Sequence, residues 1–409
     1  MNRQPGARPS AATRGMNISK RVRDGGSDAQ RPTLLIVSFS RIVADARLLK
    51  QIRAFTPDYE VTTCGYGPQP DENVAHIEID DAVSTQLKQL QGIALRARLY
   101  RFAYWVSPQA RQARRLLRSA TFDAVLANDL DTAGAVLSVF ESRRIHLDLH
   151  EFWPGRHDDV AEWTALRAPF YSWQLRKWAT QARSVTTINE SLAERYSDDF
   201  GLRCGVVTNA TEFQELAPGS VKQPIRFVHS GASQVNRRLE RMMRAVARST
   251  TGATIDLYLV GTGSAYYRSL QDLARDLGER VRILPPVSHA DLVSTLNQYD
   301  VGLPFLPPTT TNIRMSLPNK FFDYVQARLA ILTGPTPPMK ELVEKFDLGV
   351  VTADFEEESL VRAIETLDVE RIQSWKRNAD AAAEPLSAER QNAGWLEPIS
   401  HIAEETRQR

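Results

Sequence analysis

The stretch from Ser316 to Asp323 combines residue types that together favour the binding of a diphosphate. Pro318 fits the first turn of a helix, where its missing N–H costs nothing, and Ser316 stands nearby as a possible cap. A helix starting here presents the unpaired amides of Asn319 and Lys320, with the positive end of its dipole behind them. The Lys320 ammonium adds a full charge at the same place. Asp323, one turn further along, can accept hydrogen bonds from sugar or ribose hydroxyls.

Polar residues also follow two of the strands expected in the N-terminal half. They are Asn128, Asp129 and Asp131 after the run 122–127, and His150 and Glu151 after the run 144–149. In doubly wound sheets, ligands bind outside the carboxyl ends of the strands, so these side chains are candidates for binding. Asp131 could bind hydroxyl groups or cap the next helix. His150 could act as a general base, or it could simply be hydrogen-bonded at a strand end.

A pair of glycines, Gly261 and Gly263, follows the apolar run 256–260, as in a glycine-rich dinucleotide-binding turn. The third glycine of that fingerprint is missing, since Tyr266 stands there. We therefore expect a tight strand-to-helix turn that leaves room for a ligand, and no NAD. A nicotinamide-dependent oxidoreductase is an alternative supported by this pair alone.

The pattern of apolar runs predicts the elements that must position these residues. It indicates two successive parallel sheets with helices between the strands. The predicted strands are 33–39, 59–64, 122–127, 144–149, 184–188 and 204–208, then 225–229, 255–260, 281–284, 300–303 and 330–333. We expect an α/β fold of two Rossmann-like doubly wound domains that face a central cleft. The expected domains are 32–210 and 211–385, with a connection near 209–224 that contains Pro218 and Pro224.

Composition excludes several other classes of protein. An apolar content of 42% in 409 residues is enough for two packed cores, and a net charge of +2 argues against a general nucleic-acid binder. The two cysteines, Cys64 and Cys204, make a disulfide framework or a structural zinc site improbable. We predict a disordered tail over residues 1–31, with Met16 as an alternative start.

The order of these motifs resembles glycosyltransferase family four, the retaining group 1 glycosyltransferases of the GT-B fold, from about residue 33 onward. The stretch 312–327 is similar to the family's donor-binding helix, where a proline, an asparagine–lysine pair and an acidic residue recur before a tyrosine. The stretch 45–50 is similar to its first helix, 128–132 and 148–151 to two acceptor-side loops, and 186–196 to the last strand and helix of that domain. The family's final helices cross back to the N-terminal domain, which the resemblance implies for residues 386–409, with Trp395 as an anchor.

The resemblance implies a role for each candidate residue. Catalytic roles fall to His150, Arg237 and Lys320; donor binding to Gly231, Arg237, Gly261, Gly263, Ser316, Leu317, Asn319, Lys320 and Asp323; and acceptor binding to Asp45, Arg47, Asn128, Asp129, Asp131 and Glu151. A departing nucleoside diphosphate accumulates negative charge, which preorganised cations such as Arg237 and Lys320 would stabilise. Arg238 is a near alternative to Arg237, and either could be a solvated helix residue.

The sequence departs from the family at three positions. Many relatives carry two glutamates around the donor site, but Met315 stands at the first place and Asp323 at the second. Methionine accepts no hydroxyl hydrogen bond, so Asn312 or backbone amides would have to replace it. Arg328 stands where relatives often have glycine, which would cost on the order of 1 kcal/mol if its φ is positive. These changes leave the donor's identity open.

A basic and aromatic segment, 94–120, has no acidic residue. It contains Arg96, Arg98, Arg101, Arg111, Arg114, Arg115 and Arg118, with Tyr100, Phe102, Tyr104 and Trp105 between them. A basic aromatic helix can lie on an anionic membrane surface. The alternative is a solvated helix whose aromatic side packs inward.

The sequence therefore predicts transfer of a sugar from a UDP- or GDP-linked donor to a hydroxyl of a glycan or lipid-linked acceptor, without a cofactor or an obligatory metal. Retention of configuration is implied by the resemblance alone. Cell-envelope polysaccharide assembly is the expected setting, in the cytoplasm or at the inner face of the membrane. The alternatives are a catalytically silent GT-B scaffold or sugar-nucleotide sensor, and a non-hydrolysing sugar-nucleotide epimerase.

Overall fold

The first domain is built around a central strand, β1 (Thr33–Arg41), whose side chains alternate between two buried layers. Leu35 and Val37 face one core, whereas Leu34 and Ile36 face the other, and all four are fully buried. In this computed structural model, which describes residues 31–409, β1 has a parallel neighbour on each side. A strand buried on both faces needs a continuous apolar run, which is how it is recognised in the sequence.

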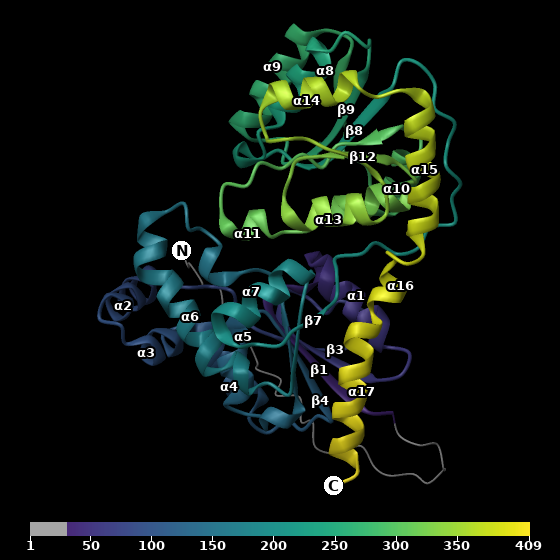
Figure 1. Cartoon of the computed structure of the whole chain (residues 1–409). Helices are drawn as coiled ribbons and strands as arrows, with labels where there is room; N and C mark the ends of the chain where they lie inside the picture. The colour runs from purple at the N-terminus through teal and green to yellow at the C-terminus, as the bar shows by residue number, and fades with distance from the viewer. Residues whose placement is uncertain (1–30) are drawn as a thin grey trace, which may run out of the picture. The chain divides into compact units, whose positions relative to one another are not determined.

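The described residues form two parallel sheets (Figure 1). The first contains β1, β2 (Glu60–Tyr66), β3 (Ala75–Glu78), β4 (Ala124–Asn128), β5 (Ile145–Leu149), β6 (Ser184–Thr187) and β7 (Gly205–Val206), in the order β3-β2-β1-β4-β5-β6-β7. The second contains β8 (Arg226–Ala232), β9 (Thr254–Val260), β10 (Val281–Leu284), β11 (Val301–Gly302), β12 (Ala330–Thr333) and β13 (Gly349–Val351), in the order β10-β9-β8-β11-β12-β13.

Helices connect the strands of each sheet. In the first domain they are α1 (Ala46–Phe55), α2 (Thr85–Arg96), α3 (Tyr100–Trp105), α4 (Pro108–Leu117), α5 (Leu130–Leu137), α6 (Ala168–Lys177) and α7 (Glu190–Phe200), with the single turns η1 (Ile42–Ala44), η2 (Ser142–Arg144), η3 (Trp153–Gly155), η4 (Trp163–Arg167) and η5 (Ala179–Gln181). In the second they are η6 (Val235–Arg237), α8 (Leu239–Arg248), α9 (Ala265–Leu277), α10 (His289–Leu296), α11 (Thr311–Arg314), α12 (Asn319–Gln326), α13 (Pro337–Lys345), α14 (Glu357–Glu365) and α15 (Val369–Ala383).

The last helices return to the first domain. After α16 (Ala388–Gln391), α17 (Ala393–Arg407) lies along the first sheet (Figure 1). Its Trp395 and Ile399 are buried in the same core as Leu34 and Ile36 of β1. The guanidinium of Arg47, on α1, lies 4.6 Å from the centroid of the Trp395 ring. The chain's C-terminal segment is therefore part of the first hydrophobic core.

The two strand orders confirm the predicted fold class, two Rossmann-like doubly wound domains. Strand order reverses between β1 and β4 in the first sheet, and between β8 and β11 in the second. Ligands of such sheets bind at the carboxyl edge, next to the reversal. The loops after β4, β5, β8 and β11 are therefore the ones to examine. The predicted tail over residues 1–31 falls, except for Arg31, outside the described residues.

The structure differs from the sequence prediction in two places. Strands β3 and β13, of four and three residues, were not predicted because neither offers an apolar run long enough to stand out. The segment 94–120 is not one basic aromatic helix but the end of α2, then α3 and α4. The break between α2 and α3 contains Arg98, whose φ is +55°. Among residues 31–409, no helix has both the length and the apolar character needed to cross a membrane.

Arg328 shows how the chain tolerates a positive φ where a glycine was expected. Its φ is +58°, and its side chain is almost completely buried. Its guanidinium donates to Asp380 Oδ1 at 2.6 Å and to the Gln214 carbonyl at 2.7 Å. These hydrogen bonds offset a backbone cost on the order of 1 kcal/mol.

Candidate functional site

The first turn of α12 is open for an anion. Helix α12 begins at Asn319, with Pro318 as its N-cap residue, and no side chain caps it. This corrects the prediction that Pro318 lies inside the first turn and that Ser316 caps the helix. The Ser316 hydroxyl instead donates to the Ile313 carbonyl at 2.8 Å. Because no side chain takes the first amides, the Asn319 and Lys320 N–H groups keep their hydrogen-bonding capacity for a ligand.

Lys320 is held by a histidine that sequence reasoning did not select. Its Nζ lies 3.1 Å from Nε2 of His229, a fully buried residue of β8. The other ring nitrogen of His229, Nδ1, lies 2.8 Å from the Leu303 carbonyl, to which it can only donate. Nε2 is then the unprotonated nitrogen, and the Lys320 ammonium donates to it. Burial, with the Lys320 and Arg237 charges, holds the pKa of His229 well below its usual range, in agreement with a neutral ring.

The position of Lys320 depends on the absence of a side chain at Gly231. A Cβ on Gly231 would lie 2.7 Å from Lys320 Nζ, well inside contact distance. The φ of Gly231 is +144°, a conformation that residues with a side chain rarely adopt. Gly231 thus lets the end of β8 and Lys320 approach each other. This close approach explains why a glycine is needed at this position.

A second cation, Arg237, lies close to Lys320. Burial lowers the pKa of Arg237, and its charge joins burial in lowering the pKa of Lys320 to about 7. Within residues 31–409, no carboxylate lies within ion-pair distance of either side chain. Arg238 is exposed, and its guanidinium lies 4.0 Å from Glu240. Because Arg237 lowers the pKa of Lys320 and neither cation has an ion-pair partner among the described residues, the site favours an anion.

Asp323 lines a cavity whose lining does not include Lys320. Its buried carboxylate accepts a hydrogen bond from the Thr211 hydroxyl at 2.6 Å, and burial raises its pKa. A cavity of about 170 Å³ lies beside it, lined by residues of α1, α10 and α12 and of the segment between the domains. Its polar lining consists of Lys50, Arg53, Thr211, Glu212, Gln214, His289, Asn319 and Asp323. Asp323 therefore lines this cavity, and one of its carboxylate oxygens is already hydrogen-bonded to Thr211.

The remaining predicted donor residues surround the same edge of the second sheet. Gly261, with a φ of +83°, directly follows β9, and its carbonyl accepts a hydrogen bond from Ser233 at 2.9 Å. Gly263 is exposed in the turn before α9. Leu317 is buried, and its carbonyl accepts from Asn209 Nδ2 at 3.2 Å. Gly261 and Gly263 thus form the predicted strand-to-helix turn.

In the first domain, His150 is enclosed by two carboxylates. Its Nε2 lies 3.2 Å from Asp148 Oδ2 and 3.0 Å from Asn128 Oδ1, and its Nδ1 lies 3.3 Å from Asp129 Oδ2. Burial alone would lower the pKa of His150, but Asp129 and Asp148 outweigh it and raise this pKa. Both ring nitrogens face protein oxygens that can accept a hydrogen bond. This geometry opposes the predicted general-base role, because a base needs a free nitrogen.

Arg47 and Asp45 have internal partners that leave little for an acceptor. Arg47 forms a buried, bidentate ion pair with Asp148. Its Nε donates to Asp148 Oδ2 and its Nη2 donates to Asp148 Oδ1, each at 2.8 Å. Its Nη1 donates to the Val207 carbonyl at 2.9 Å. Asp45 caps α1 by accepting from the Arg47 and Leu48 amides. We therefore revise these two predicted acceptor-binding residues to supports of the first domain.

The other acceptor candidates meet at the carboxyl edge of β4 and β5. Asn128 is fully buried and paired with Gln51 by two hydrogen bonds of 2.9 Å. Asp129 has a φ of +63° and accepts from the His150 amide at 3.0 Å. Glu151 lies 2.7 Å from Arg156. Asp131 is half-buried, and burial, with the nearby Asp129 charge, raises the pKa of its carboxyl to about 7.

The loops that carry these residues contact the segment that leads into α12. The Phe152 amide donates to Asn312 Oδ1 at 2.9 Å, and Asn189 Nδ2 donates to the Met315 carbonyl at 2.8 Å. Asn312, proposed as a substitute for the missing glutamate, thus already binds the backbone of the first domain. The side chain of Met315 packs against the first domain's core. The segment 311–317 therefore links the two sets of candidate residues.

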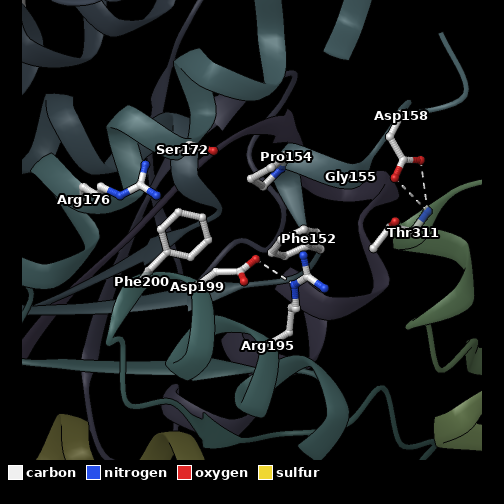
Figure 2. A pocket seen from close by; sticks show the side chains of 10 residues that line it. All are labelled: Phe152, Pro154, Gly155, Asp158, Ser172, Arg176, Arg195, Asp199, Phe200 and Thr311. Carbon is white, nitrogen blue, oxygen red and sulfur yellow. Dashed lines mark hydrogen bonds and ion pairs between the residues drawn. The ribbon is translucent and has the colours of Figure 1, made fainter. Parts of the chain in front are cut away.

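A cavity of about 350 Å³ opens beside these contacts (Figure 2). It is lined by Phe152, Pro154, Gly155, Asp158, Ser172, Arg176, Arg195, Asp199, Phe200 and Thr311. Figure 2 shows the Asp158 carboxylate directed to the backbone of Thr311, where it accepts from the amide at 3.0 Å, and Arg195 paired with Asp199 at 2.7 Å. Both domains contribute to this polar hollow.

Comparison with known proteins identifies the second domain. Residues 224–368 match the family described as glycosyl transferases group 1. The second domain is therefore similar to group 1 glycosyl transferases. The matched region contains β8, α12 and the Arg237–Lys320 pair, and therefore the predicted donor-binding residues of the enzyme. No curated protein sequence matches the chain.

Solved structures show that the chain has the GT-B fold. Sucrose-phosphate synthase from Thermosynechococcus elongatus is 12% identical, with a TM-score of 0.66 over 92% of this chain and 99% of that one. An Anabaena protein, HepE in complex with UDP, is 16% identical, with a TM-score of 0.64 over 90% and 100%. An α,α-trehalose 6-phosphate synthase from Burkholderia multivorans is 10% identical, with a TM-score of 0.64 over 92% and 100%.

The candidate residues of the second domain fall into two groups. Gly231 and His229 lie next to Lys320, whose pKa the Arg237 charge lowers, whereas Asn319 and Asp323 line the cavity beside α12. Sequence reasoning missed His229, Thr211 and Lys50. The signal for His229 was its place at the carboxyl end of a predicted strand. Lys50, whose pKa is lowered to about 8 by burial and by Arg47, gave no comparable signal, because its neighbours come from distant segments.

Proposed function

We propose that this glycosyltransferase moves a sugar from a UDP- or GDP-linked donor to a hydroxyl of a glycan or lipid-linked acceptor, with retention of configuration and without an obligatory metal. The observation that carries the proposal is the Arg237–Lys320 pair, which lies by the open first turn of α12 without a carboxylate partner. A diphosphate would neutralise both cations and accept from the free amides.

In the proposed reaction, the bond between the anomeric carbon and the β-phosphate oxygen breaks. The acceptor oxygen forms a new bond on the same face of the sugar, and the acceptor's proton passes to the departing phosphate. Arg237 and Lys320 stabilise the negative charge that grows on this phosphate. No protein nucleophile and no protein base is required, which agrees with the fully occupied nitrogens of His150.

The donor's nucleoside would lie toward the cavity beside Asp323. This cavity borders Asn319 at the start of α12, so a diphosphate on α12 directs its nucleoside here. Asp323 has one oxygen that Thr211 does not use, and it can accept a ribose hydroxyl. The HepE structure, which contains UDP, is consistent with a nucleotide in this fold.

The acceptor would enter on the side of His150 and the cavity of Figure 2. A volume of about 350 Å³ is within the usual range for small-molecule sites, and its hydroxyl, carboxylate and guanidinium groups suit a polyol. The half-buried Asp131 would contact an acceptor hydroxyl. The proposed setting is assembly of a cell-envelope polysaccharide from the cytoplasmic side.

The experiment measures donor binding by thermal shift and isothermal calorimetry with UDP, GDP, ADP, NAD and the common UDP- and GDP-sugars. We expect one sugar nucleotide to stabilise the protein and Lys320→Met to weaken its binding by about a hundredfold. The matched control is Lys340→Met, an exposed lysine of α13. Binding of NAD alone, or equal binding by both variants, would show that the proposed donor site is wrong.

A catalytically silent sugar-nucleotide sensor is the second candidate, because Met315 turns its side chain into the first domain's core. A sensor would bind the donor but neither hydrolyse it nor transfer its sugar to any glycan. An epimerase would convert the donor without an acceptor. Analysis of products from the bound sugar nucleotide, with and without a mixture of glycan acceptors, separates the three activities.

A further inference from the structure

Helices α2, α3 and α4 expose large apolar side chains close together in sequence and space. The exposed fractions are 63% for Ile93, 57% for Leu99 and 51% for Phe102. Leu99 and Phe102 line one hollow of about 590 Å³ together with Tyr100, Trp105 and Trp173. Single exposed apolar residues are ordinary, but a contiguous group marks a surface that contacts an apolar partner.

The same surface is strongly basic. Arg98 and Arg101 line the hollow that contains Phe102, and Trp105 is shared with a second hollow of about 330 Å³. The second hollow is lined by Arg111, Arg114, Arg115 and Arg118 in addition to Trp105. In the described part of the chain, no carboxylate pairs with any of these six arginines; only Arg96, at the end of α2, approaches one, at 3.6 Å from Glu162.

The fold itself keeps both kinds of side chain on the outside. The buried faces of α3 and α4 are occupied by other residues, namely Ala103, Tyr104, Ala110, Ala113 and Leu117. Tyr104 donates its hydroxyl to the Asp131 carbonyl, so the helices are anchored without Leu99 or Phe102. The aromatic side of this segment therefore does not pack inward completely. Phe102 points to solvent while Tyr104 is buried.

We propose that the surface made by Ile93, Leu99, Phe102 and the six arginines docks on an anionic lipid bilayer. Apolar side chains next to cationic ones match the boundary where acyl chains meet phosphate headgroups. Nucleic acid would satisfy the arginines but not three exposed aliphatic and aromatic side chains. Each arginine near an anionic leaflet strengthens binding by about fivefold. The surface belongs to the first domain and does not include the donor site, so the proposal stands independently of the sugar donor.

The test is co-sedimentation of the full chain with vesicles of phosphatidylcholine alone and of phosphatidylcholine mixed with phosphatidylglycerol. We expect binding to the mixed vesicles, little binding to neutral ones, and loss of binding at high salt. The variants are Arg101→Gln/Arg115→Gln/Arg118→Gln and Leu99→Ser/Phe102→Ser, each expected to weaken binding by at least about tenfold. The charge-matched control is Arg244→Gln/Lys340→Gln/Arg377→Gln, on exposed helix faces of the second domain.

Two further measurements keep the outcomes distinct. The thermal shift with the sugar nucleotide should be the same in wild type and in both surface variants, which shows that they are folded and that donor binding is separate. If the control variant lost as much binding to mixed vesicles as the surface variants, the proposal would be wrong. Absence of binding to mixed vesicles, or salt-sensitive binding to single-stranded DNA without vesicle binding, would also overturn it.

Discussion

Lys320 Nζ donates to Nε2 of His229 across 3.1 Å, and the other nitrogen of that histidine donates to the Leu303 carbonyl. The lysine is thus held by a neutral acceptor instead of a carboxylate. A carboxylate would fix the ammonium equally well, but it would also cancel the charge that an incoming diphosphate needs. A neutral imidazole positions the cation and leaves its charge for the ligand.

Gly231→Ala should weaken donor binding through a steric effect on Lys320. The new methyl group would lie 2.7 Å from Nζ and would displace the ammonium from the anion site. The matched control is Gly201→Ala, where φ is +64° and nothing lies within 4 Å of the added Cβ. Each variant should lose about 1 kcal/mol of unfolding free energy from its positive φ. Only Gly231→Ala should also raise the Kd of the sugar nucleotide, measured by calorimetry. An equal Kd in both variants would contradict this role.

The protein should take up a proton when the donor binds above neutral pH. Burial and Arg237 lower the pKa of Lys320 to about 7, so the free protein holds this lysine increasingly neutral as pH rises through that value. A bound diphosphate favours the ammonium and returns this pKa toward its usual value. At about pH 8, calorimetry in buffers of different ionisation enthalpy should show proton uptake, and at about pH 6 it should not. Uptake that persists in Lys320→Met would show that another group titrates.

The fold could be predicted because buried parallel strands leave continuous apolar runs. Residues 33–39 and 225–229 are such runs, and each begins a sheet whose remaining strands follow at regular spacing. The edge strand β13 could not be predicted, since three residues with a glycine at the start carry no periodic signal. Its place is set by pairing with β12.

The candidate site was predictable in part. The order proline, asparagine, lysine indicated a helix N-terminus, because proline tolerates that position and the amides after it stay free. The contact between Lys320 and His229 was not predictable, since it joins segments 91 residues apart. The same reason applies to Arg47, for which the sequence predicts an acceptor contact. Its partner Asp148 lies 101 residues away, so nothing in the sequence distinguishes a buried arginine from one that awaits a ligand.

Arg47→Met should destabilise the enzyme severely without a specific effect on acceptor binding. The variant leaves the Asp148 carboxylate fully buried with its main partner removed, which costs about 3–5 kcal/mol. Urea unfolding would measure this loss. The control is Arg53→Met, whose salt bridge to Glu212 is exposed and worth less than about 1 kcal/mol. If Arg47→Met kept normal stability but raised the acceptor's KM, the original prediction of an acceptor contact would be right.

His150→Gln should destabilise the enzyme more at low pH than at high pH. Asp129 and Asp148 outweigh the effect of burial and raise the pKa of His150 above its ordinary value. The folded state therefore favours the imidazolium, and its stabilisation is fully present below the pKa of the unfolded chain. That stabilisation is lost as pH rises through the pKa of the folded state. Glutamine never carries the charge, so His150→Gln should lose less unfolding free energy at high pH. Urea unfolding of wild type and variant at about pH 5.5 and about pH 9 gives the two differences, with the exposed His401→Gln as the control. A larger loss at high pH would mean that the neutral imidazole is the stabilising form, and it would restore His150 as a candidate base.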